Sequence, residues 1–153
     1  MTLKEYKQKR KFSGKEKTNE PKIKKAKSSK KPIFVIHKHH ASHLHWDLRL
    51  EMNGVLKSWA VPKQPPKAKG TKRLAIHVED HPLSYADFEG TIPKGNYGAG
   101  KVEIWDSGFY ELKDKDKKKI EIVFHGKKIK GDYVLIKTNY GNKPEKSWLF
   151  FKV

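Results

Sequence analysis

The sequence predicts a mainly β fold, a small barrel or a sandwich, from three observations. Short apolar runs alternate with polar residues at period two, which is the spacing of a half-buried strand. Gly, Pro, Asn and Asp separate these runs at short intervals. Asn53-Gly54 stands between two such runs and is a strong β-hairpin signal. Many short strands joined by turns are typical of barrels and sandwiches.

The expected strands can be placed in chain order. The clearest alternation puts four apolar residues on one face: Leu44, Trp46, Leu48 and Leu50. We expect Trp46 and Trp59 in the core rather than as platforms for stacked bases. The predicted strands are Ile33–Ile36, Leu44–Glu51, Val55–Val61, Leu74–Glu79, Lys101–Trp105, Ile120–Phe124, Tyr133–Ile136 and Trp148–Val153. Residues 80–100 are expected to form a long irregular connection, and residues 113–119 a solvated turn.

Charge and composition divide the chain into a basic N-terminal arm, residues 1–31, and a domain, residues 32–153. The arm holds 13 Lys or Arg, three Asp or Glu and few apolar residues, so we expect it to be partly flexible until it binds a partner. The domain holds 22 basic and 14 acidic residues and is itself basic. A basic arm on a basic body indicates a polyanionic partner such as nucleic acid. Solubility, or adaptation to a hot cytoplasm, would explain the charge without one.

Several classes of protein are excluded by what the sequence lacks. Without Cys, there are no disulfides, no Cys-based zinc sites and no thiol nucleophiles. No apolar run approaches the roughly 20 residues that span a bilayer. The N-terminus has no apolar signal core. We therefore expect a cytoplasmic monomer with no membrane partner.

Five of the eight histidines lie between positions 37 and 45. On the expected strand, His45, Asp47 and Arg49 project from the same face. His39 comes just before this strand, and an Ala-Ser turn could fold it back beside them. Two His and one carboxylate can share a divalent cation and leave positions open for substrate. Arg49, next along the face, could hold a phosphate with two parallel hydrogen bonds.

Other interpretations of this cluster stay open. His40 and His43 fall outside the pattern and are expected to be solvated, and the whole cluster could be fortuitous. A ligand set of two His and one Asp suits Mn, Fe, Co or Zn better than Ca. His45 and Asp47 with a downstream His77 or His81 would instead match a non-haem Fe(II) oxygenase triad.

The segment FVIHKHHASHLHWDLRLEMNGVLKSWAVPK, residues 34–63, resembles the phosphoesterase module of bacterial DNA ligase D and its free-standing relatives. The likeness continues through RLAIHVEDHPLSYADFEGTIPKGNYGAGKVEIWDSGFYE, KGDYVLIKT and WLFFKV, so it runs from about Lys31 to the last residue. It implies a small antiparallel β-barrel with its site in a curved groove, and an enzyme that stands alone. It also implies Mn-dependent healing of 3′ ends, in which a 3′-terminal ribonucleoside is removed first and the 3′-phosphate second.

The resemblance also implies a set of site residues. It places the metal ligands on His39, His45 and Asp47, the three that the strand pattern selects. Mn²⁺ is the expected ion, and Co²⁺ or Zn²⁺ would also suit these ligands. The residues that it places near the phosphate are Arg49, Arg73, Lys63, Tyr85 and His81, with His81 as the catalytic histidine.

In the arm, QKRKF and TNEP resemble family motifs, which makes Arg10 and Glu20 candidates for the diesterase step. Two positions depart from the family pattern. His37 replaces a usual Gln and could still hydrogen-bond the phosphate. His77 also replaces a Gln or an apolar residue and could face the groove near His81.

The implied partners are DNA or RNA/DNA 3′ ends, with a separate ligase or polymerase of a repair system. The alternative function is a basic nucleic-acid-binding module without catalysis.

Overall fold

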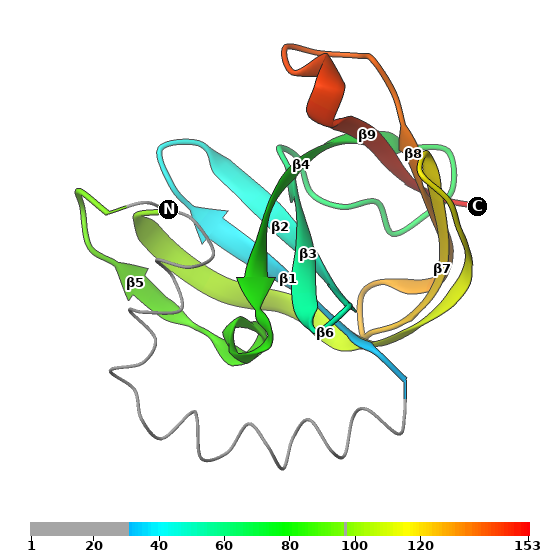
Figure 1. Cartoon of the computed structure of the whole chain (residues 1–153). Helices are drawn as coiled ribbons and strands as arrows, with labels where there is room; N and C mark the ends of the chain where they lie inside the picture. The colour runs from blue at the N-terminus through cyan, green and yellow to red at the C-terminus, as the bar shows by residue number, and fades with distance from the viewer. Residues whose placement is uncertain (1–30, 97) are drawn as a thin grey trace.

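The computed structural model describes residues 31–96 and 98–153, which form nine strands and two short 3₁₀ helices (Figure 1). The elements are β1 Ile33–His40, β2 Leu44–Met52, β3 Val55–Val61, β4 Lys72–Pro82, η1 Leu83–Asp87, β5 Gly90–Ile92, β6 Gly100–Lys115, β7 Lys119–His125, β8 Lys130–Lys137, η2 Pro144–Lys146 and β9 Ser147–Lys152. The predicted mainly β fold is confirmed. In this part of the chain, no helix is long and apolar enough to cross a membrane.

Eight strands close into an antiparallel barrel. They follow the order β1-β2-β3-β4-β9-β8-β7-β6, and β6 pairs back onto β1. The short strand β5 pairs with β6 outside this ring (Figure 1). The implied antiparallel barrel is therefore confirmed. Closure leaves these eight strands without a free edge for another chain to pair with.

Two expectations about the elements are wrong. Strand β6 runs over 16 residues instead of the five expected, because it pairs with β1 along its first part and with β7 along its last. Residues 80–100 are not simply irregular, since they include the end of β4, helix η1 and strand β5. Both differences come from pairing between distant segments, which local alternation does not report.

The predicted hairpin at Asn53-Gly54 is confirmed. Both residues have positive φ, +52° and +81°, as a type I′ turn requires. This two-residue turn sets the register of β2 against β3, so that Arg49 lies opposite Ser58. The turn thus brings together two polar side chains that are nine residues apart.

Strands β1 to β3 are buried on both faces. Trp46 and Trp59 join the barrel core, as predicted. Leu44 does not, because it is the first residue of β2 and is 42% exposed. On the outer face a second apolar cluster forms where η1 packs over β1 and β3. Its buried members are Val35, Leu56, Tyr85 and Ala86. Polar side chains beside this cluster are consequently removed from water.

The buried carboxylate of Asp106 in β6 ties this strand to the turn between β7 and β8. It accepts backbone N–H bonds from Ser107, Lys127, Lys128 and Ile129, at 2.8–3.0 Å. Buried N–H groups need such partners because they have lost water. One side chain therefore satisfies three donors of the irregular turn and one of its own strand.

We expect Asp106→Ala to lower the free energy of unfolding by about 3 kcal/mol, because it leaves the buried Ile129 N–H and three part-buried N–H groups without their acceptor. Urea denaturation measures the loss. Asp116→Ala is the matched control, since Asp116 also accepts two backbone N–H bonds but lies in an exposed turn that water can satisfy. Equal losses in the two variants would contradict the role of burial.

Candidate functional site

The site residues lie on the outer face of β1, β2 and β3, opposite the barrel core. The register sets His37 opposite Asp47 and His39 opposite His45. Residues paired in this way on adjacent strands point to the same face, with Cβ atoms about 5 Å apart. His39 is thus brought back beside His45, as predicted, although it lies within β1 rather than in a turn before β2.

Three side chains, His39, His45 and Asp47, offer ligand atoms within 4.8 Å of one another. His39 Nδ1 lies 3.6 Å from Asp47 Oδ2, and His45 Nε2 lies 3.3 Å from Asp47 Oδ1. The other nitrogen of each ring faces a backbone carbonyl oxygen. His39 Nε2 lies 2.8 Å from the Gly98 oxygen, and His45 Nδ1 lies 3.0 Å from the His43 oxygen.

A carbonyl oxygen only accepts, so these bonds place each ring proton on the nitrogen that faces away from Asp47. In the neutral rings, an unprotonated nitrogen then faces the carboxylate. Metal-ligating imidazoles are oriented in this way in proteins. The donor set therefore fits a divalent transition-metal ion.

Electrostatics keeps Asp47 ionised. Burial alone would raise the pKa of this carboxyl, but the charge of Arg49 and the polar contacts with His39 and His45 outweigh it and hold the pKa far below its usual range. Burial likewise acts to lower the pKa of His45, but the hydrogen bond to Asp47 and its charge raise that pKa above 6.5. A proton between His45 and Asp47 therefore occupies the position that a cation would take.

Arg49 is 3% exposed and links most of the site. Its Nε donates to His37 Nδ1 at 3.1 Å, and its Nη1 donates to Ser58 Oγ at 2.8 Å and to His81 Nδ1 at 3.2 Å. Its Nη2 donates to Asp47 Oδ2 at 3.3 Å. Four of the five N–H groups of a guanidinium are thereby engaged. This differs from the expected two-pronged grip on a phosphate, because one Nη2 hydrogen remains for it.

His37 lies beneath Arg49 and supports it. Its side chain is fully buried, and while Nδ1 accepts from Arg49, Nε2 donates to the Phe88 carbonyl at 3.1 Å. Burial first, and then the charge of Arg49, lower the pKa of His37 to about 3. Both ring nitrogens are thus occupied in this structure, and the predicted contact between His37 and phosphate stays a prediction.

His81 reaches the same face through an irregularity in the sheet. The pairing of β3 with β4 shifts by one residue between Leu56 and Ser58, which turns His81 to the outer face. Burial and then the charge of Arg49 lower the pKa of His81 to about 3, so the ring is neutral. The Tyr85 ring lies 4.8 Å from the Arg49 guanidinium and 5.0 Å from the His81 ring. Both predicted residues thus belong to this cluster.

The same shift separates His77 from His81. His77 pairs with Trp59 before the irregularity, and its ring lies 5.2 Å from this core tryptophan. The expectation that His77 faces the groove is therefore wrong. A metal triad that uses His77 with Asp47 is also contradicted, because the two side chains occupy opposite faces of the sheet.

Arg73 and Lys63 are not part of this cluster, and Arg73 lies opposite the core residue Phe150, on the other face of the sheet from Asp47. Arg73 Nε donates to the Gln64 carbonyl at 2.8 Å, which ties the start of β4 to the loop after β3. Lys63 is exposed in that loop, two residues beyond Val61, which pairs with Trp46 of β2. Neither has a described contact with Asp47 or Arg49, so their roles stay predictions.

The remaining residues are quickly placed. His40 and His43 are exposed, as predicted, and His40 bonds Glu103 at 2.6 Å. Arg10 and Glu20 lie outside the described residues, as does the arm up to residue 30.

Sequence reasoning missed three groups that orient the site: Ser58 Oγ and the carbonyl oxygens of Phe88 and Gly98. The contact of Ser58 with Arg49 was predictable from the sequence. Counting outward from the Asn53-Gly54 turn pairs Arg49 with Ser58. The carbonyl groups gave no signal, because they come from the connection between β4 and β6, far away in sequence.

Comparisons with known proteins agree with one another. A family described as the DNA Ligase D 3′-phosphoesterase domain matches residues 37–137. A multifunctional non-homologous end joining DNA repair protein LigD from Mycobacterium tuberculosis is 54% identical over 110 residues, 69% of this chain. The corresponding proteins from Pseudomonas aeruginosa and Mycolicibacterium smegmatis are 44% identical over 98% of the chain and 48% identical over 76%. These matches span only 14%, 18% and 16% of the relatives' own lengths.

The bonds of His37 generate a prediction about the support of Arg49. A glutamine amide also offers one acceptor and one donor, so His37→Gln should keep both bonds, whereas His37→Leu should cost about 2 kcal/mol through the orphaned Arg49 Nε–H. Urea denaturation measures stability, and ¹⁵N NMR follows exchange of the Arg49 Nε–H with solvent. Fast exchange in His37→Gln, or slow exchange in His37→Leu, would contradict this role.

Proposed function

Because this chain belongs to the DNA ligase D 3′-phosphoesterase domain family, we propose that it heals nucleic-acid 3′ ends in two hydrolytic steps. The first removes a 3′-terminal ribonucleoside by cleaving its phosphodiester, and the second removes the remaining 3′-phosphate to leave a 3′-OH. The observation that carries the proposal is the outer-face cluster in which two oriented imidazoles and an ionised carboxylate adjoin Arg49 and His81.

We propose Mn²⁺ as the ion held by His39, His45 and Asp47, with Co²⁺ or Zn²⁺ as further ions that suit these ligands. A bound divalent cation supplies positive charge at the phosphate oxygens and lowers the pKa of a coordinated water. Arg49 adds a fixed charge beside Asp47. Phosphoryl transfer depends mainly on positioning and on charge stabilisation, and these buried groups are oriented before substrate arrives.

In the second step, His81 is the proposed proton donor to the leaving 3′-oxygen. Its Nδ1 lies 3.2 Å from both Arg49 Nη1, which only donates, and the Glu79 carbonyl oxygen, which only accepts. In the neutral ring, Nδ1 can accept the hydrogen bond from Arg49. In the protonated ring, Nδ1 can donate one to the Glu79 carbonyl oxygen. A negative phosphate nearby favours protonation. The imidazolium then gives its Nε2 proton to the 3′-oxygen and returns to the neutral form.

The product suggests where this activity belongs in repair. A 3′-phosphate or a damaged 3′ end cannot be extended or joined, whereas a 3′-OH can. The relatives are named for non-homologous end joining of DNA. We propose that this chain acts on DNA or RNA/DNA ends before a polymerase or a ligase uses them.

The central test measures release of nucleoside and of phosphate from oligonucleotides that end in a 3′-ribonucleoside or a 3′-phosphate, with added Mn²⁺ or with chelator. We expect both activities with Mn²⁺ and neither with chelator. Asp47→Ala should lose Mn²⁺ and turnover, while His81→Ala should keep Mn²⁺ and lose at least about 100-fold in rate. His125→Ala is the control, since this exposed histidine pairs with Glu111 outside the site. Binding without hydrolysis would support the non-catalytic module, and loss of Mn²⁺ in His81→Ala would make His81 a ligand.

Metal affinity should depend on pH through His45. Because the pKa of His45 is raised in the metal-free protein, its proton must leave before Nε2 can bind an ion. Affinity should therefore fall by about tenfold for each unit of pH below that raised pKa, with about one proton released for each ion bound. Calorimetry in buffers of different ionisation enthalpy, from about pH 8 to about pH 5, measures both. An affinity that does not change over this range would exclude His45 as a ligand.

A further inference from the structure

The loop between β3 and β4, together with the start of β4, is strongly and one-sidedly basic. Residues 62–73 contain five basic residues and no acidic one. The lysines of this segment are all exposed: Lys63, Lys67, Lys69 and Lys72. Lys63 already belongs to the proposed site by resemblance, but the other three have no assigned role.

This loop leaves β3 and passes beside strands β8 and β9 before it enters β4 (Figure 1). It leaves β3 at Val61, which pairs with Trp46, the neighbour of His45 in β2. Further on, the Tyr133 hydroxyl of β8 donates to the Pro66 carbonyl at 2.6 Å, and the backbone of Lys69 bridges to Lys152 of β9. The loop is thereby held at both ends against the barrel.

Two loop lysines and two strand lysines form what we call the lysine track: Lys67 and Lys69 of the loop, Lys72 of β4 and Lys152 of β9. The backbones of Lys69, Lys72 and Lys152 lie close together, since Lys72 pairs with Phe151 and Lys69 bridges to Lys152. The Lys72 side chain projects from the same face as Phe151, and the Lys152 side chain from the same face as Tyr133. The Lys72 ammonium lies 5.1 Å from the Phe151 ring centre. The track therefore continues the run of positive charge that Lys63 begins in the loop after β3.

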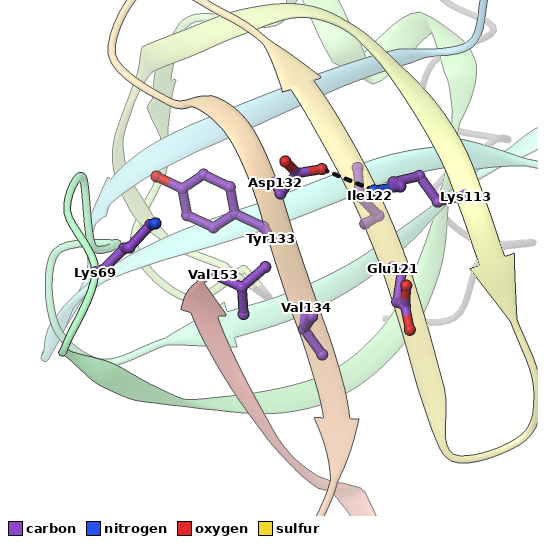
Figure 2. Close-up of a pocket in the computed structure, with 8 residues that line it drawn as sticks. All are labelled: Lys69, Lys113, Glu121, Ile122, Asp132, Tyr133, Val134 and Val153. Atoms are coloured by element: carbon purple, nitrogen blue, oxygen red, sulfur yellow. Dashed lines mark hydrogen bonds and ion pairs between the residues drawn. The ribbon is translucent and has the colours of Figure 1, made fainter.

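The track has no internal counter-charge. In the described part of the chain, carboxylates pair with Lys57, Lys101, Lys113 and Lys119, but with no lysine of the track. Figure 2 shows Lys69 and Asp132 lining the same cavity of about 360 Å³, with the Asp132 carboxylate turned toward Lys113 at 3.2 Å. Clustered like charges repel one another, so an extended anion that bridges them would be bound favourably.

We propose that the lysine track binds the phosphodiester backbone of the nucleic-acid strand that leads away from the 3′ end in the site. The direction of the strand rests on the proposed function, whereas the attraction to a polyanion does not. A backbone offers one negative charge at each nucleotide, which suits cations spread along a loop. The track gives affinity without sequence preference, because phosphate contacts carry no base information.

The binding experiment compares two triple variants of the full chain. Lys67→Ala/Lys69→Ala/Lys72→Ala removes three charges from the track. Lys115→Ala/Lys117→Ala/Lys118→Ala is the control, which removes three exposed charges at the β6–β7 turn. This turn lies beside the end of β8, since the Lys118 carbonyl oxygen accepts a hydrogen bond from the Lys137 backbone N–H. Fluorescence anisotropy measures the affinity for an oligonucleotide of about 20 nucleotides in chelator at several salt concentrations, and circular dichroism checks that each variant is folded.

We expect the track variant to reduce the slope of log affinity against log salt by about 2 to 3, and the control variant by less than about 1. If the slope falls by about 0.9 for each removed lysine contact, the bound nucleic acid is a duplex. If it falls by about 0.7 for each contact, the bound nucleic acid is a single strand. Equal reductions in both variants would mean that only net charge matters, and would overturn the proposal.

Kinetics then separates docking from chemistry. On the long oligonucleotide with a 3′-phosphate, the track variant should lower kcat/KM at least tenfold and leave kcat at saturation unchanged. On a 3′-phosphate dinucleotide, which has no strand to reach the track, both constants should stay at the wild-type level. A loss on the dinucleotide would place these lysines in the reaction site and contradict docking. If the wild type hydrolyses no 3′ end but the slope difference persists, the proposed function fails while the lysine track stands.

Discussion

The burial of one guanidinium is the constraint on which the site depends. Arg49 is 3% exposed, and a buried charge is tolerated only when its hydrogen-bonding groups have partners. The acceptors come from β1, β2, β3 and β4, through His37, Asp47, Ser58 and His81. Four strands must therefore keep their register for Arg49 to be satisfied. The fold and the geometry of the site are in this way stabilised by the same bonds.

Arg49 also sets the charge of its neighbours. It helps to hold Asp47 as a carboxylate and lowers the pKa of both His37 and His81. The resting site therefore combines an ionised Asp47 with neutral imidazoles at His37 and His81, which suits coordination on one side and proton transfer on the other. A freely exposed arginine at the same position would exert a weaker field, because water screens it. Only one of the five N–H groups of Arg49 stays free of these bonds, as a consequence of its role in organising the site.

The sequence predicted much of this arrangement, and its failures have a common physical cause. Period-two alternation and the Asn53-Gly54 turn suffice to gather Asp47 and Arg49 on one face, because both are local features of backbone geometry. The separation of His77 from His81 was missed, since it depends on a one-residue shift between β3 and β4 that no local pattern announces. The length of β6 and the existence of β5 depend likewise on strand pairing over long sequence separations.

Ligand identity was accessible from sequence, whereas protonation was not. Residue type and spacing indicate that His39 can bind a cation, but which ring nitrogen faces Asp47 is set by the carbonyl oxygen of Gly98, 59 residues away. The Phe88 carbonyl oxygen has the same effect on His37. Both oxygens belong to the connection between β4 and β6, which carries no alternation and few charges. The backbone of that connection thus decides the chemistry of side chains that the strands only place, because a buried imidazole takes the tautomer that its fixed neighbours accept.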